Sequence, residues 1–185
     1  MTRSVPIARV VLFWAIALGG AAFDLATKAA VFASLGEPNL GPPRPIIRDV
    51  LELKTSHNPG ALWGFGRDWA YSSLVFAGLS VVAGVAIVYW LFFRGAANDR
   101  RLTIALGLIM AGAIGNCYDR LVLGHVRDFV YFHVDPIDFK CAIFNFADNM
   151  LVAGALILMV LALRPEPPEA VDDLAPTADA AMPVS

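Results

Sequence analysis

Four long apolar runs constrain the fold of this chain more than any other feature of its sequence. They cover about Val10–Leu35, Trp69–Phe93, Leu102–Tyr118 and Ala142–Leu163. Each run is long enough to cross about 30 Å of hydrocarbon as a helix. Hydrophobic residues make up 58% of the 185 residues and charged residues only 16%, whereas soluble domains average about 25% charged residues. The sequence therefore predicts an all-α membrane protein with four transmembrane helices.

The arginines predict how these helices are oriented. Four spans place both termini on one side of the membrane, together with the loop between the second and third runs. That short loop carries Arg94, Arg100 and Arg101, and basic residues in short loops mark the cytoplasmic side. We therefore expect both termini in the cytoplasm. The first run is long and lacks a small-residue cleavage pattern, so we expect it to be retained as a span.

Two loops are then extracytoplasmic, covering about Gly36–Asp68 and Leu121–Cys141. The first alternates apolar and polar residues over Leu51–Thr55, which predicts a short strand. A small β-containing loop region thus accompanies the helices. We expect the first loop to cover a functional site, with Trp63 and Phe65 directed toward lipid.

The last residues, 165–185, differ in composition from the rest of the chain. They are rich in proline, alanine and acidic residues. Such a segment buries too little apolar area to offset its ordering entropy. We therefore expect a disordered cytoplasmic tail after a membrane domain of residues 1–164.

Two aspartates, Asp128 and Asp148, stand where a membrane disfavours charge. Asp128 lies in the second extracytoplasmic loop, and Asp148 lies near the start of the fourth apolar run. An ionised carboxylate within a span costs roughly 2.5 to 3.5 kcal/mol, so such residues are usually paired and functional. Their presence in separate segments predicts a carboxylate dyad.

Other polar residues of the spans recur at helical spacing. Residues three or four apart share a helix face, and three of the apolar runs carry such sets. The sets are Asp24 with Lys28, then Gly112 with Asn116 and Arg120, and finally Asn145 with Asp148. Three helices are therefore expected to present polar faces near the same membrane surface.

Five short motifs carry these residues in a fixed order. They are Asp24-Leu-Ala-Thr27-Lys28, Asn58-Pro-Gly60-Ala61, Gly112-Ala-Ile-Gly115-Asn116-Cys-Tyr-Asp119-Arg120, Val126-Arg-Asp128-Phe129 and Phe144-Asn145-Phe-Ala147-Asp148. Together with the four apolar runs, this set resembles lipoprotein signal peptidase (signal peptidase II). That family is an aspartyl endopeptidase of the bacterial inner membrane. It removes the signal peptide from diacylglyceryl-modified prolipoproteins by cutting just before the lipid-bearing cysteine.

The resemblance implies roles for individual residues. Asp128 and Asp148 would be the catalytic pair, near the extracytoplasmic surface. The supporting or substrate-binding positions would be Asp24, Lys28, Asn58, Gly60, Gly112, Asn116, Arg120 and Asn145. It also implies lipid-modified prolipoprotein signal peptides and membrane lipids as partners, and no metal or cofactor. We expect a monomer, because one bundle holds both aspartates, and no nucleic-acid partner, because the net charge is −2.

The chemistry of paired carboxyls agrees with this expectation independently of any family. Amide hydrolysis needs one ionised group to take a proton from water and one protonated group to polarise the carbonyl. Two carboxyls that share a site hold one proton between them and titrate as a unit. A low-dielectric position raises the carboxyl pKa further.

Simpler interpretations of the same residues remain open. Asp128 could be a solvated acid beside Arg127, and Asp148 could be an acid that stabilises a helix N-terminus. The Asp24 and Lys28 side chains could form an ion pair with no catalytic role. We nevertheless expect this pair to support the site.

The sequence gives less support to other reaction classes, and to a carrier function, than to the aspartyl peptidase. Cys117 and Cys141 have no recognisable histidine partner. The sequence also lacks the His-Glu-x-x-His pattern of zinc peptidases. A proton-coupled carrier using Asp24, Lys28 and Asp148 is the alternative of a different class. The absence of an inverted repeat argues against it.

Overall fold

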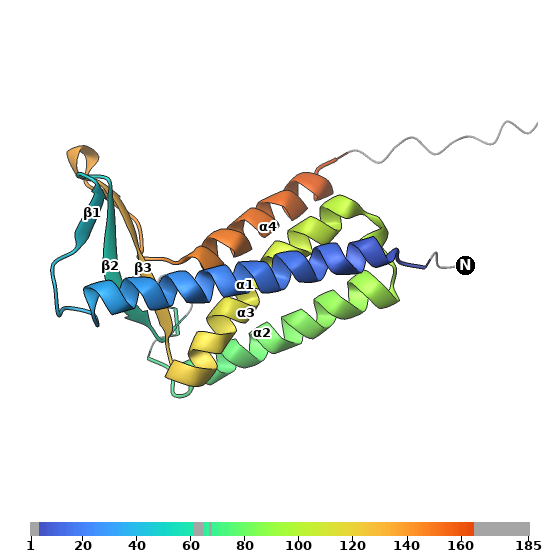
Figure 1. Ribbon diagram of the computed structural model, residues 1–185, viewed down its shortest axis with the longest axis horizontal. Helices are drawn as coiled ribbons and strands as arrows, with labels where there is room; N and C mark the ends of the chain where they lie inside the picture. Colours follow the sequence, from blue (N-terminus) through green and yellow to red (C-terminus); the bar gives the residue numbers. More distant parts are fainter. Residues whose placement is uncertain (1–3, 61–64, 67, 165–185) are drawn as a thin grey trace, which may run out of the picture.

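Helices and a small sheet occupy separate regions of the computed structural model, which describes residues 4–60, 65–66 and 68–164. In Figure 1 the long helices run alongside one another and the sheet lies at one end of them. The α-helices of the described residues are α1 (Ile7–Leu35), α2 (Ser72–Val88), α3 (Arg100–Leu123) and α4 (Phe146–Ala162). The start of α1 and the end of α4 lie together at the end opposite the sheet (Figure 1). Trp63 and the predicted tail lie outside the described residues.

Three of these helices are long and apolar enough to cross a membrane. Among the described residues they are Ile7–Leu35, Ser72–Phe93 and Arg100–Leu123. The second includes a π-helical turn, Tyr89–Phe93, that continues α2. Helix α4 has 17 residues and spans about 26 Å at 1.5 Å per residue. The sequence prediction of spanning helices is therefore confirmed for three runs, and the fourth span stays a prediction.

Helix α3 lies at the centre of the helical region, with partners on several sides. The Asp99 carboxylate accepts hydrogen bonds from Arg101 N (2.7 Å) and Leu102 N (3.4 Å) at its start. Gly124 ends it with a positive φ of 78°, the left-handed conformation that glycine adopts most readily. The apolar run seen in the sequence ends at Tyr118, and the helix continues past it to Leu123, through the Arg120 that was expected on its polar face.

Small residues let α3 and α4 approach closely. A Cβ on Gly112 would clash with the Ala147 carbonyl oxygen and the Leu151 side chain. A Cβ on Gly154 would lie 2.6 Å from the carbonyl oxygen of Ala105. Membrane helices commonly pack through such small residues. This packing brings the polar stripe of α3 against the N-terminal turn of α4.

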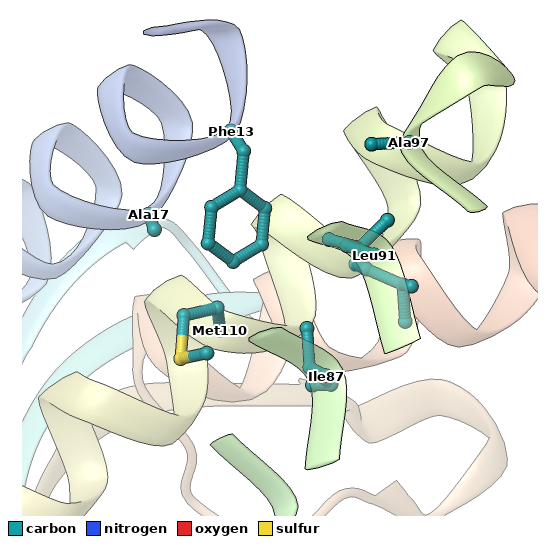
Figure 2. Packing of buried hydrophobic residues seen from close by; sticks show 7 residues of the cluster. Phe13, Ala17, Ile87, Leu91, Ala97 and Met110 are labelled. Atoms are coloured by element: carbon teal, nitrogen blue, oxygen red, sulfur yellow. The ribbon is translucent and has the colours of Figure 1, made fainter. Parts of the chain in front are cut away.

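A hydrophobic cluster fixes the other end of the helices. Figure 2 shows the Phe13 ring of α1 directed toward Leu91, Ile87 and Met110. Phe13 and Leu91 are fully buried. This cluster holds α1, α2 and α3 together at the end remote from the sheet. The polar residues of the spans are thereby left at the sheet end.

The sheet contains four antiparallel strands in the described residues, in the order β1-β2-β3-β4. They are β1 (Arg44–Ile47), β2 (Leu51–Asn58), β3 (Val126–Val134) and β4 (Phe139–Lys140). The predicted strand at Leu51–Thr55 is confirmed and extends to Asn58. The sequence predicted no strand within Leu121–Cys141, whereas β3 forms there and pairs with β2.

Candidate active site

A buried group of charges lies between α1, α3 and β3. The Lys28 ammonium is 2.7 Å from an Asp24 carboxylate oxygen and 3.3 Å from an Asp119 oxygen. All three side chains are fully buried. Asp119 also accepts from the Arg127 guanidinium at 2.7 Å and from the Arg127 backbone N–H at 3.0 Å. Each buried charge therefore has an opposite charge beside it, as the low dielectric requires.

The buried lysine also orients an amide of α3. Lys28 Nζ donates to Asn116 Oδ1 at 2.8 Å. An ammonium can only donate, so it selects the amide oxygen and turns the Asn116 NH₂ group the other way. That NH₂ group donates to Asp148 Oδ1 at 2.8 Å. The Lys28 charge thus acts on Asp148 through one amide.

Asp148 lies in the first turn of α4, where a reciprocal cap holds it. Asn145 Oδ1 accepts from Asp148 N at 3.0 Å, and Asp148 Oδ2 accepts from Asn145 N at 3.1 Å. This capping box satisfies two backbone donors that a helix start leaves unpaired. The Asp148 carboxyl is half-buried at this helix start.

Asp128 lies on β3, facing the start of α4. Its Oδ1 accepts from Asn145 Nδ2 at 2.6 Å, and its Oδ2 accepts from Asn58 Nδ2 at 3.2 Å. The residue is only 3% exposed. Burial and the neighbouring Asp148 carboxylate raise the pKa of Asp128 to about 7, although both amide hydrogen bonds oppose the shift. Asn145 therefore contacts both carboxyls that the sequence singled out, because its side-chain NH₂ group donates to Asp128 and its backbone N–H donates to Asp148.

The turn after β2 completes the site. Gly60 N donates to Asn58 Oδ1 at 3.0 Å, which leaves the Asn58 NH₂ group facing Asp128. Gly60 O accepts from Arg120 Nη2 at 2.9 Å. The Arg120 guanidinium also lies over the Phe76 ring, 5.5 Å from its centroid. Arg120 thus anchors the turn while its charge remains in the field of both aspartates.

Hydrogen bonds join nearly all the residues that the sequence predicted for this site. The connected residues are Asp24, Lys28, Asn116, Asp148, Asn145, Asp128, Asn58, Gly60 and Arg120. Gly112 takes no part in this network and instead gives room for α4. Phe65 is 62% exposed, and the lipid contact predicted for it stays a prediction.

Asp119 and Arg127 were not among the predicted site residues. Asp119 was interpreted as the polar end of the third run, and Arg127 only as a neighbour of Asp128. Asp119 lies three residues after Asn116 and therefore near the same helix face. That spacing was the available signal.

The carboxyls of this site outnumber its cations by one, so they can share one proton. Three cations, Lys28, Arg120 and Arg127, lie among four carboxyls, Asp24, Asp119, Asp128 and Asp148. With every group ionised the cluster carries one excess negative charge, and a single shared proton neutralises it. Within the described residues no group of three or more His, Cys, Asp or Glu side chains could hold a metal ion.

Comparison with known proteins identifies the family of this site. Residues 16–164 match the family model described as signal peptidase (SPase) II, which covers most of the chain. The chain belongs to the signal peptidase II family. It is therefore a member of a peptidase family, which favours the endopeptidase over the carrier that the sequence left as an alternative.

Individual relatives agree with this membership. The chain is 40% identical over 166 residues to the lipoprotein signal peptidase of Rhodopirellula baltica, covering 84% of this chain and 73% of the relative. It is 37% identical over 151 residues to the enzyme of that name from Bacillus subtilis, covering 80% of this chain and 91% of the relative. A solved bacterial membrane enzyme shares the fold, with a TM-score of 0.71, 28% identity and coverage of 89% of this chain and 98% of that one.

Proposed function

We propose that this chain is an aspartyl endopeptidase of the bacterial inner membrane. It removes the signal peptide from diacylglyceryl-modified prolipoproteins and cuts before the lipidated cysteine. The observation that carries this proposal is the joining of the Asp128 and Asp148 carboxyls through one residue, Asn145, whose side chain donates to Asp128 and whose backbone N–H donates to Asp148. Membership of the signal peptidase II family supports the choice of substrate.

The two carboxyls are suited to different roles. Asp148 receives hydrogen bonds from the Asn116 amide and the Asn145 backbone N–H, and it is less buried than Asp128 and so more accessible to water. We assign it as the base that takes a proton from the attacking water. Asp128 is the more buried and has the raised pKa, so we assign it the shared proton. It polarises the scissile carbonyl and then protonates the leaving nitrogen.

This assignment predicts a loss of activity in alkaline solution. Cleavage is expected to fall as the pH rises above about 7, because the protonated form of Asp128 is then depleted. The same ionisation opposes folding. The folded state holds the Asp128 proton more tightly than the unfolded chain, so stability decreases from about pH 4 to about pH 7. Initial cleavage rates in vesicles on both sides of about pH 7 test the predicted fall, and a rate still rising at about pH 9 would contradict it.

The membrane arrangement follows from the same site. We propose that α4 is the fourth span, that both ends of residues 1–164 are cytoplasmic and that the sheet lies at the extracytoplasmic surface. The placement of the start of α1 and the end of α4 at the end away from the sheet supports this topology (Figure 1). The apolar residues exposed along α2, such as Leu79, Val82 and Val85, suit contact with lipid tails.

Lipid dependence is the most direct test of this function. The purified chain in lipid vesicles is incubated with a prolipoprotein that carries the diacylglyceryl group and with the same prolipoprotein lacking it. We expect cleavage before the modified cysteine and a rate at least about tenfold lower without the lipid. Equal rates on the two substrates, or a product that begins elsewhere, would refute the assignment.

Asn58→Ala is expected to slow cleavage by about tenfold while changing the melting temperature little. Its amide donates to Asp128, and removing one such donor from a catalytic site costs more in turnover than in folding. The measurement pairs a cleavage rate with a thermal denaturation curve. Ser34→Ala, which removes an exposed side-chain bond to Val31 O, is the control. Unfolding without any separate effect on turnover would make Asn58 a structural turn residue only.

Truncation after Pro168 is expected to leave insertion and cleavage unchanged within about twofold, or roughly 0.4 kcal/mol on the barrier. A negatively charged cytoplasmic leaflet should repel the acidic tail, whose apolar residues are mostly alanines with little area to bury. Cleavage per inserted molecule is compared with that of the full chain. A large loss by a truncated protein present in normal amount would assign the tail a role.

A further inference from the structure

An aromatic stack lies on the sheet face opposite to the one that carries Asp128. The His57 and His125 rings are stacked with centroids 3.7 Å apart, and Phe32 of α1 lies parallel to His57 at 5.8 Å. His57 Nε2 is 2.8 Å from a Glu37 carboxylate oxygen. The stack therefore joins the end of α1, the end of β2 and the residue that precedes β3.

The register of β2 and β3 relates this stack to the active site. Ser56 pairs with Asp128, His57 with Arg127 and Asn58 with Val126. Successive side chains point to opposite faces of a sheet. Asn58 and Asp128 are thus diagonal neighbours on one face, and His57 and His125 are diagonal neighbours on the other. The two diagonal pairs belong to the same end of one ladder.

We propose that the His57–His125 stack positions Asn58 against Asp128, and that protonation of both imidazoles releases this contact. This inference rests on the proposed function, because it concerns the same site. When at most one of the two imidazole rings is charged, the stack fixes the spacing and twist of the β2–β3 pair where β2 ends. Two charged rings at this separation repel, and the ladder end that carries Asn58 moves away from β3.

The charges around the pair set the direction of this response. The groups that face it are Glu37 after α1, Asp119 on α3 and Arg127 on β3. Burial and the nearby His57 lower the pKa of His125, whereas Asp119 and Glu37 act in the opposite sense. A lowered pKa in the folded state means that stability is lost as the pH falls. Acidification is therefore the condition that opens the stack.

Two substitutions at His125 separate the effect of the aromatic ring from the effect of its charge. His125→Phe keeps an aromatic ring and cannot be protonated, whereas His125→Ala removes the ring. At about pH 7.5 we expect His125→Ala to lower kcat about fivefold with KM within about twofold, and His125→Phe to remain within about twofold in both constants. Equal kcat values for His125→Ala and the unchanged chain, or no rescue by phenylalanine, would overturn the positioning role.

The acid response provides a second readout. The ratio of the kcat of His125→Phe to the kcat of the unchanged chain is expected to rise about fivefold when the pH is lowered from about 7.5 to about 5. The melting temperature of His125→Phe should fall less than that of the unchanged chain over the same pH interval. The melting measurement requires no substrate, so it tests the stack even if the unchanged chain does not cleave lipidated prolipoprotein. Failure to cleave that substrate would refute the proposed function and not the stack. Parallel kcat and melting profiles for the two proteins would overturn the pH-dependent release.

Discussion

Asp128→Asn and Asp148→Asn are each expected to lower prolipoprotein cleavage by roughly a hundredfold to ten-thousandfold, the range supplied by one positioned acid or base. Either change keeps the shape of the side chain and removes half of a pair that shares a proton. Asn145 donates to both carboxyls, to Asp128 from its side chain and to Asp148 from its backbone N–H, so one substitution disturbs the linked pair as a whole. Processing is measured in membranes that contain equal amounts of each variant.

A matched control is available at the same end of the molecule, in the sheet. Asp49 is exposed in the turn between β1 and β2 and has a φ of 62°, a conformation that asparagine also tolerates. Asp49→Asn should therefore retain the full cleavage rate. Near-normal turnover by either Asp128→Asn or Asp148→Asn would remove that residue from the catalytic pair.

Lys28→Met should destabilise the folded protein by about 3 to 5 kcal/mol, the usual cost of leaving buried charges without their partner. Lys28 neutralises Asp24 and Asp119 together. It also fixes the direction of the Asn116 amide, so the molecules that still fold should cleave more slowly. The measurements are the amount of folded protein extracted from membranes and its melting temperature.

Two further variants test the physical cause of this loss. Lys54→Met makes the same substitution at an exposed lysine of β2 and should change stability little. Adding Asp24→Asn to Lys28→Met removes one of the stranded carboxylates while keeping an oxygen for the Ala147 N–H, which now donates to Asp24 at 2.8 Å. The double variant should recover part of the lost stability. If Lys28→Met alone melted like the unchanged chain, the buried ion pairs would have no structural importance.

The parts of the fold that the sequence could predict are those set by local patterns. Long apolar runs predicted α1, α2 and most of α3, because burial in lipid needs only a continuous apolar surface. The last residues of α3 lie beyond the apolar run, which ends at Tyr118, and were indicated only by the spacing of Asn116 and Arg120. Asp119 continues the helix because Lys28 and Arg127 neutralise it, and neither partner lies in the same segment. Strand β3 was missed although it is rich in valine and aromatic residues, because its pairing with β2 is long-range.

The same division applies to the candidate site. Helical spacing correctly paired Asp24 with Lys28, whose charges lie 2.7 Å apart. Spacing could not reveal that the Asn145 amide would link Asp148 to a carboxyl on β3, since that contact depends on how α4 meets the sheet. The raised pKa of Asp128 likewise follows from tertiary burial. The sequence could therefore identify candidate acids, but their separate roles required the fold.

The source of the oxygen added during cleavage tests the proposed dyad most directly. A single turnover of lipidated prolipoprotein is run in water labelled with heavy oxygen, with hydroxylamine present. Two carboxyls that activate water should place the label in the new carboxyl terminus of the released signal peptide, and hydroxylamine should trap nothing. A signal-peptide hydroxamate would instead reveal an acyl-enzyme formed by a nucleophilic side chain, and it would contradict direct attack by water between Asp128 and Asp148.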